Sequence, residues 1–205
     1  MACITEDRDL YERLKKSVVI VFVKQDKAIS LGTGFVVRSE GLILTCHHML
    51  SKSRNVICCR DVDGAEYNST VVKENPARDM LLLKVTSDEP MKWNTAEFST
   101  EDDFPVGKNV FTIGHSNALT YCFLKGQLAY PHRHGFCRRM STYFTVVAMD
   151  SDLPVMEINN VHTGKGHSGK PVFDSAGRVI GMLMGGGESA NFVIPKSELE
   201  SFIAG

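Results

Sequence analysis

Short runs of β-branched and other apolar residues, separated by polar turns, make up most of the chain. In the N-terminal half, the runs that predict strands are Ser17–Lys24, Gly32–Arg38, Leu42–Cys46, Asn55–Arg60, Glu66–Lys73 and Met80–Val85. In the C-terminal half they are Asn109–Ile113, Thr120–Tyr130, Ser141–Val147, Val155–Ile158, Pro171–Phe173, Arg178–Met184 and Asn191–Ile194. About a dozen short strands with turns between them predict an all-β sandwich or a pair of barrels.

Helical spacing of apolar residues is confined to the two ends of the chain. Asp9–Lys16 carries Leu10 and Leu14 on one face, and Pro195–Ala204 has a proline at a helix start. Residues 87–108 are polar and rich in turn formers, which predicts a connection between two halves. We therefore expect a single domain over 1–205, with subdomains at about 15–88 and 106–195 and a C-terminal helix at 196–205.

Composition and charge exclude several classes of protein. The chain has 205 residues, 43% of them hydrophobic, and a net charge of −1. A substantial core is therefore expected, and neither nucleic acid nor an anionic membrane is an expected partner. No apolar run approaches membrane-spanning length. The sequence shows no sign of a homo-oligomer and leaves that question open.

The N-terminus and the cysteines bear on cellular location. The first nine residues are acidic and lack the basic and apolar regions of a secretory signal. The six cysteines include the adjacent pair Cys58-Cys59 and show no spacing typical of a disulfide framework. Both features predict reduced thiols in a cytoplasmic or nuclear, hence intracellular, protein.

The most informative stretch is a glycine-rich loop from Thr163 to Pro171, which contains Gly166-His167-Ser168-Gly169. Dense glycines occur where the backbone takes conformations that side chains forbid or approaches a ligand closely. A serine at the tip of such a loop, with backbone N–H groups beside it, has the setting of a nucleophile with an oxyanion site. A plain glycine-rich hairpin turn has the same pattern, so the decision rests on a base and an acid elsewhere.

Two other segments supply such groups. His47 and His48 follow the apolar strand Leu42–Cys46, and a strand end holds an imidazole well for acid–base chemistry. Asp79 opens the apolar strand Met80–Val85, where a carboxylate can hold an imidazole in one tautomer. His, Asp and Ser then follow one another in the order of the chymotrypsin-type two-barrel scaffold.

Several blocks of the sequence, in order, resemble the trypsin-like serine peptidases of the HtrA (Deg) type. The resemblance runs from about residue 15 to the C-terminus, and its blocks are Gly32–Val37, Gly41–His48, Asn75–Val85, Val106–His115, Gly166–Pro171, Gly177–Gly181 and Asn191–Pro195. It implies two six-stranded antiparallel β-barrels with short terminal helices, and a serine endopeptidase without a PDZ domain.

The resemblance also implies a role for each matched position. Ser168 would be the nucleophile, His48 the general base and Asp79 the residue that orients it. The N–H groups of Gly166 and Ser168 would form the oxyanion hole. Protein or peptide substrates would bind as an added strand along Leu183–Gly186.

The primary specificity pocket is assigned by position in the same way. His162 and Thr163 would lie at its base, with Leu183, Met184 and Gly185 along a wall. No acidic residue is placed there to pair with lysine or arginine, which predicts an uncharged, apolar residue of small to medium size before the scissile bond.

The sequence also departs from the family pattern. His167 stands where the family has Asp or Asn, Lys170 replaces a glycine, and His47 replaces a small residue, which leaves His47 as a second candidate base. The departures in the serine loop leave open a catalytically inactive or resting protein of the same fold that binds peptides.

Two further hypotheses are a metal site and a cysteine nucleophile. His132-Arg133-His134 with Cys137 offers metal ligands without an apparent fourth, and a solvated loop is the alternative. A cysteine nucleophile is not favoured, because none lies in the glycine loop. We expect no cofactor and no metal.

Overall fold

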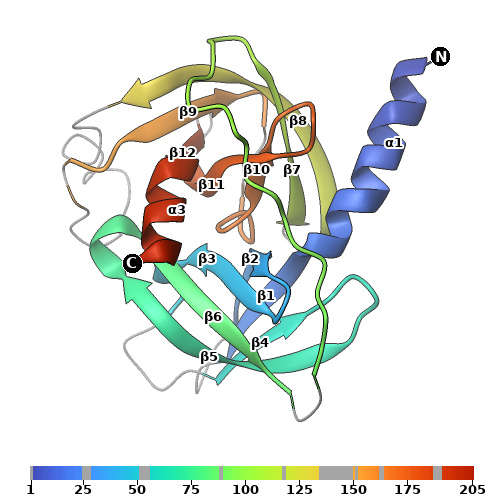
Figure 1. Ribbon diagram of the computed structural model, residues 1–205, viewed down its shortest axis with the longest axis vertical. Coiled ribbons are helices and arrows are strands. Elements are labelled where there is room, and N and C mark those ends of the chain that lie inside the picture. Colours follow the sequence, from blue (N-terminus) through green and yellow to red (C-terminus); the bar gives the residue numbers. More distant parts are fainter. Residues whose placement is uncertain are drawn as a thin grey trace.

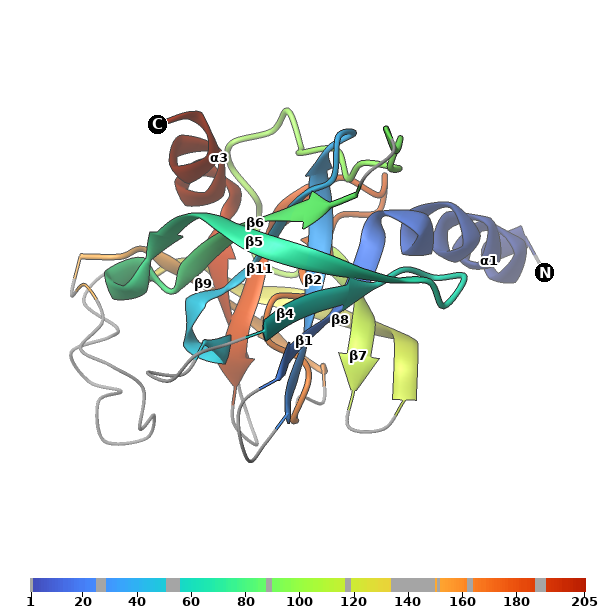
Figure 2. The same cartoon turned by 90° about the horizontal axis from the view of Figure 1, so that it is seen from below.

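The computed structural model describes residues 2–24, 29–50, 56–87, 90–116, 119–133, 150, 152–161, 164–186 and 191–205. Within these ranges the strands form two closed antiparallel barrels of six strands each (Figures 1 and 2). The first barrel is built from β1 (Val18–Lys24), β2 (Ile29–Arg38), β3 (Leu42–Cys46), β4 (Val56–Arg60), β5 (Glu66–Asn75) and β6 (Met80–Thr86). The second is built from β7 (Asn109–Ser116), β8 (Leu119–Arg133), β9 (Val155–Asn159), β10 (Pro171–Phe173), β11 (Val179–Gly186) and β12 (Asn191–Pro195).

The two closed six-stranded barrels confirm the expected fold class. Both barrels close in the same order of strands. In the first, the order is β1-β2-β3-β6-β5-β4, and in the second it is β7-β8-β9-β12-β11-β10. Closure gives each strand a neighbour on both sides over at least part of its length, which explains how strands as short as β10 are accommodated. The predicted strand Ser141–Val147 lies outside the described residues.

The terminal helices differ in detail from the sequence pattern. α1 spans Ala2–Leu14 rather than Asp9–Lys16, and a 3₁₀ turn at Lys15–Ser17 leads from it directly into β1. α3 spans Lys196–Ala204 and buries Leu199 and Phe202. No helix in the described part of the chain is long and apolar enough to cross a membrane.

Three buried clusters hold the molecule together. One fills the first barrel around Ile43 and Leu83, and another fills the second barrel around Leu128 and Ile180. The third lies between the barrels, where residues such as Phe35 meet residues from the other half. The two barrels therefore present a shared, packed interface on which a site can be held rigidly.

The connection between the barrels is packed rather than loose, unlike the polar linker that the sequence pattern predicts. Trp93 N donates to Ser39 O at 2.8 Å, and Ser99 N donates to Val179 O at 2.9 Å. Trp93 and Phe104 are buried. This segment therefore hydrogen-bonds to both barrels as it passes from β6 to β7 (Figure 1).

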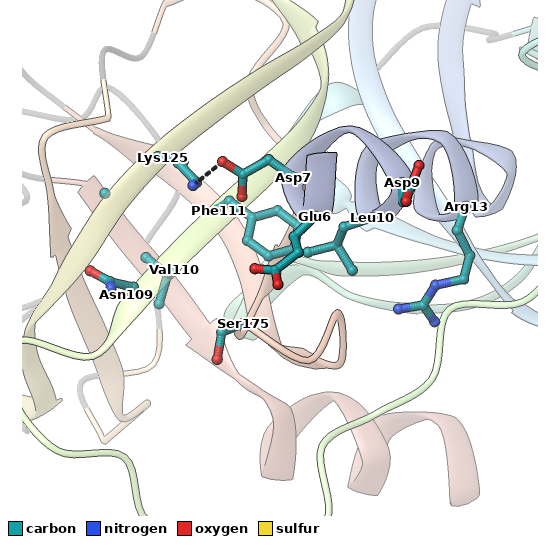
Figure 3. Close-up of a pocket in the computed structure, with 11 residues that line it drawn as sticks. Glu6, Asp7, Asp9, Leu10, Arg13, Asn109, Val110, Phe111, Lys125 and Ser175 are labelled. Carbon is teal, nitrogen blue, oxygen red and sulfur yellow. Dashed lines mark hydrogen bonds and ion pairs between the residues drawn. The ribbon is translucent and has the colours of Figure 1, made fainter. Parts of the chain in front are cut away.

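Helix α1 lies against the second barrel. Tyr11 Oη donates to Tyr121 O at 3.1 Å, and Asp7 pairs with Lys125 of β8. A hollow of about 690 Å³ remains between the helix and this barrel (Figure 3). Its lining includes Leu10 and Phe111 and none of the candidate catalytic residues.

Candidate active site

The first barrel places His48 at the end of a buried strand. β3 ends at the buried Cys46, and the chain turns through a 3₁₀ segment at His47–Met49. His48 Nδ1 lies 2.7 Å from Asp79 Oδ2, and His48 Nε2 lies 2.8 Å from Ser168 Oγ. The imidazole thus bridges the other two predicted residues.

The neighbouring histidine has a different environment. His47 Nε2 lies 3.4 Å from Glu74 Oε2. Its backbone N–H donates to Asp79 O at 3.2 Å, which joins the histidine turn to the aspartate segment. Of the two candidate bases, the geometry therefore brings His48, and not His47, to the serine.

Asp79 lies at a left-handed backbone position between β5 and β6, with φ of 54°. It ends a short turn at Pro76–Arg78, where the Asn75 side chain accepts from Arg78 N at 3.1 Å. Arg78 also pairs with Asp150 and Glu198 from the second half of the chain. The turn that directs the Asp79 carboxylate toward His48 is therefore held by Asn75 on one side and by the second half of the chain on the other.

Both carboxylate oxygens of Asp79 are occupied by His48. Oδ1 accepts from His48 N at 2.8 Å, while Oδ2 faces Nδ1, and the residue is only 2% exposed. An acceptor at Nδ1 fixes the tautomer with its proton there. Nε2 is then free to accept the proton of Ser168.

A buried thiol lies beside this carboxylate. Cys46, His48 and Asp79 have potential ligand atoms within 4.8 Å of one another. Burial, and then the charge of Asp79, raises the pKa of the Cys46 thiol well above its usual value. A metal ion binds a cysteine as the thiolate, and a raised pKa keeps the Cys46 thiol protonated. This set of donors is therefore poorly suited to holding a metal ion.

The serine loop belongs to the second barrel and is held by Thr33 of the first. Thr33 N donates to Ser168 O at 2.9 Å, and Thr33 Oγ1 donates to Gly166 O at 3.1 Å. Thr45 Oγ1 in turn donates to Thr33 O at 2.7 Å. These bonds connect strands β2 and β3, which lead to His48, directly to the loop that carries the nucleophile.

The backbone of this loop forms a turn beside the serine. Gly166 has φ of +93°, and its carbonyl accepts from Thr33. His167 N donates to Gly164 O at 3.2 Å. Among the hydrogen bonds of the described residues, none joins Gly166 N or Ser168 N to another backbone group, and these are the two N–H groups that the resemblance assigns to an oxyanion hole.

Comparison with known proteins agrees with this geometry. Residues 32–182 match the family model described as a trypsin-like peptidase domain. The chain belongs to the trypsin-like peptidase family. The family's mechanism uses a His-Asp-Ser triad, the residue types that meet here.

Relatives of this trypsin-like chain include HtrA proteases. A probable periplasmic serine endoprotease, DegP-like, from Ectopseudomonas mendocina is 27% identical over 178 residues, covering 84% of this chain and 34% of the relative. Serine protease HTRA2, mitochondrial, from Bos taurus is 27% identical over 207 residues, covering 95% of this chain and 42% of the relative. The chain thus spans about a third of the length of the DegP-like relatives.

A solved structure shares the fold of this trypsin-like chain. The serine endoprotease from Yersinia pestis superposes with a TM-score of 0.77 at 17% identity, covering 96% of this chain and 65% of the other. At this identity the likeness concerns the fold.

The predicted cytoplasmic or nuclear location is wrong on this comparison. DegP-like relatives from Ectopseudomonas, Pseudomonas and Bartonella are named as periplasmic, so an intracellular location is not supported. The inference rested partly on unpaired thiols. Cys46, Cys58 and Cys59 prove to be buried, and burial shields a thiol whatever the surroundings, so such thiols do not report the compartment.

Two of the three departures from the trypsin-like pattern, His167 and Lys170, belong to the serine loop itself. The His167 ring is buried, with Nε2 2.6 Å from Ser116 Oγ. Burial, then the charges of Lys170 and His115, lower the pKa of His167 to about 4. The imidazole is therefore neutral near pH 7, and its bond to Ser116 anchors the loop to the end of β7.

Lys170 is fully buried, and its Nζ has no hydrogen-bond partner in the described part of the chain. Burial lowers the pKa of the Lys170 ammonium to about 8 from 10.5, with a small opposing contribution from Cys122. A buried cation without a carboxylate beside it destabilises the folded state.

Replacing Lys170 with Met is therefore expected to stabilise the protein at pH 7. The unfolded state binds more protons between pH 8 and pH 10.5, so the wild type gains stability as the pH rises through that window. A depression of this size corresponds to roughly 3 kcal/mol below pH 8. Urea unfolding at pH 7 and pH 9.5 measures it, with Lys165→Met as the exposed control. A destabilised Lys170→Met protein, with no such pH dependence in the wild type, would contradict this account.

The predicted specificity pocket is only partly described. His162 and Thr163 lie outside the described residues. The Leu183 side chain packs in the core of the second barrel, and Met184 is buried in the cluster between the barrels. Gly185 pairs with Phe192 of β12, so this segment offers backbone rather than side chains to a ligand.

Only one of the three candidate metal ligands of the sequence lies in the described part of the chain. His132 is exposed, with Nε2 4.0 Å from Asp103 Oδ1, while His134 and Cys137 lie outside the described residues.

Sequence reasoning also missed Thr33, which joins the two barrels at the site. Its signal was the flanking pair Gly32 and Gly34, since glycines inside a strand mark close approach of another backbone.

Proposed function

We propose that this chain is the catalytic domain of a serine endopeptidase that hydrolyses protein substrates. The observation that carries the proposal is the position of His48, at 2.7 Å from Asp79 and 2.8 Å from Ser168. The proposed domain comprises both subdomains, about 15–88 and 106–195, because the first supplies the base and acid and the second supplies the nucleophile.

In the proposed mechanism Ser168 Oγ attacks the scissile carbonyl while His48 Nε2 takes its proton. Asp79, at Nδ1, stabilises the imidazolium that forms. The N–H groups of Gly166 and Ser168 would receive the negative charge on the carbonyl oxygen. His48 then gives its proton to the leaving amine, which leaves the acyl group on Ser168. In the second half of the reaction His48 takes a proton from water, the water oxygen attacks the acyl carbonyl, and His48 returns the proton to Ser168 Oγ.

The substrate is proposed to bind along β11. Gly185 and Gly186 pair with β12, whereas the ladder with β10 ends at Met182. An extended peptide can add to a strand edge of this kind through main-chain hydrogen bonds. The names of the DegP-like relatives, which are endoproteases, support a protein substrate.

Hydrolysis of denatured casein tests the proposal. We expect the wild type to release peptides, and Ser168→Ala and His48→Ala to lower the rate by at least about a thousandfold. His47→Ala is the matched control and should retain most of the activity, because His47 faces Glu74. Casein hydrolysis that persists in Ser168→Ala, or that is lost in His47→Ala alone, would refute these assignments.

A peptide-binding protein without activity is the second candidate. The observation that favours it is that two buried nitrogens of the serine loop, Lys170 Nζ and His167 Nδ1, have no hydrogen-bond partner among the described residues. If the loop takes another conformation to satisfy these two nitrogens, Gly166 N is displaced and the oxyanion site is lost, while β11 still binds peptide. Peptide binding by a well-folded wild type that hydrolyses no casein would select this candidate.

A further inference from the structure

A second cleft lies against the catalytic residues. Its volume is about 470 Å³, and Ser168, His48 and Gly166 are among its lining residues. Clefts of this size hold one or two side chains of a ligand. Because the reacting serine lines it, whatever occupies the cleft is close to the scissile bond.

The cleft is not part of the strand edge proposed for the acyl half of the substrate. None of its lining residues comes from β11, where Gly185 and Gly186 lie. Instead it is lined by the start of β2 in the first barrel. Since His48 must donate a proton to the departing amine, the space on its side suits the leaving half of the peptide.

One wall of this cleft is apolar. Ile29 and Leu31 alternate along β2, so they lie on one face of the strand, and they are 61% and 39% exposed. The buried Met49 adds a flexible apolar surface beside them. Exposed apolar side chains next to a nucleophile are a ready binding surface for another apolar group.

The described lining of the cleft carries a cation. The exposed Lys165 belongs to it, and among the described lining residues there is no aspartate or glutamate. A substrate side chain bound here meets this cation at the rim. Acidic residues on the leaving side are therefore tolerated, whereas lysine and arginine are repelled.

We infer that the peptidase selects its cleavage sites on the leaving side, through a bulky apolar residue at the first or second position after the scissile bond. Ile29, Leu31 and Met49 would bind this residue, and Lys165 would disfavour a basic one. The inference rests on the proposed endopeptidase function and adds a substrate class to it.

The test is cleavage-site profiling with a library of peptides derived from a bacterial proteome. We expect Leu, Ile, Met, Val and Phe to occur at these two positions at least about threefold above their frequency in the library, and Lys and Arg below theirs. The double variant Ile29→Ser/Leu31→Ser should lose the apolar enrichment, while the residues preferred before the cut stay the same. Val72→Ser, which removes an equally exposed apolar side chain from β5, should keep the wild-type profile.

The outcomes separate this inference from the proposed function. Cuts without apolar enrichment after the scissile bond, or enrichment that survives the double variant, overturn the inference alone. A wild type that cuts no peptide in the library overturns both. An amide substrate with only a chromophore after the scissile bond serves as the internal reference for the serine chemistry. A wild type that hydrolyses it but shows no apolar enrichment in the library keeps the proposed function and loses the inference.

Discussion

Replacing Asp79 with Asn is expected to lower kcat/KM for casein-derived peptides by about three to four orders of magnitude with the fold intact. The reason lies in the two bonds to His48. The asparagine oxygen would take the place of Oδ1, which accepts from His48 N at 2.8 Å. Its amide N–H would then donate to Nδ1, which forces the ring proton onto Nε2. A protonated Nε2 cannot accept the proton of Ser168.

Steady-state kinetics with a fluorogenic peptide measures this loss, and circular dichroism checks the fold. Glu74→Gln is the matched control, because it removes the carboxylate beside His47 rather than the one beside His48. We expect this control to retain wild-type activity. An Asp79→Asn enzyme within tenfold of wild type would show that Asp79 does not set the tautomer of His48.

Substituting Gly166 with Ala has the second largest expected effect, a loss of about a hundred- to a thousandfold in kcat. The residue has φ of +93°, and an added Cβ would lie 2.3 Å from His115 Cδ2. The loop must shift to relieve this contact. Because Gly166 N is one of the two proposed oxyanion donors, the shift removes stabilisation from the transition state.

Gly64→Ala separates this displacement from ordinary backbone strain. Gly64 has φ of +91°, but nothing lies within 4 Å of an added Cβ. It should therefore cost about 1–2 kcal/mol of stability and leave kcat unchanged. Combining Gly166→Ala with His115→Ala removes the close contact and should restore part of the rate. Full activity in Gly166→Ala alone would argue against an oxyanion site at this loop.

The parts of the site that the sequence predicted are those encoded in local pattern. His48 and Asp79 each adjoin an apolar strand, and Ser168 lies among glycines, so each could be found in its own segment. Their order along the chain and the alternation of strands and turns then indicated two barrels. Closed six-stranded barrels follow from such strands because closure gives each strand a neighbour on both sides.

The parts that it could not predict depend on contacts between distant segments. Thr33 and Gly166 lie far apart in the sequence, and only the docking of the two barrels brings the hydroxyl of one to the carbonyl of the other. The burial of Lys170 was equally invisible, since a lysine in a polar loop is ordinarily solvated. Trp93 lies between Lys92 and Asn94 in a segment without helical or strand periodicity, so the sequence did not show that the connection between the barrels is packed.

In the proposed mechanism, Ser168 is activated by His48 and Asp79. Covalent labelling with a fluorophosphonate probe, mapped by mass spectrometry, tests it most directly, because the probe reacts with an activated serine and needs no knowledge of the substrate. We predict stoichiometric labelling of the wild type at Ser168 and none in Ser168→Ala or His48→Ala. A folded wild type that stays unlabelled while a control peptidase reacts, or an adduct on any other residue, would contradict the account.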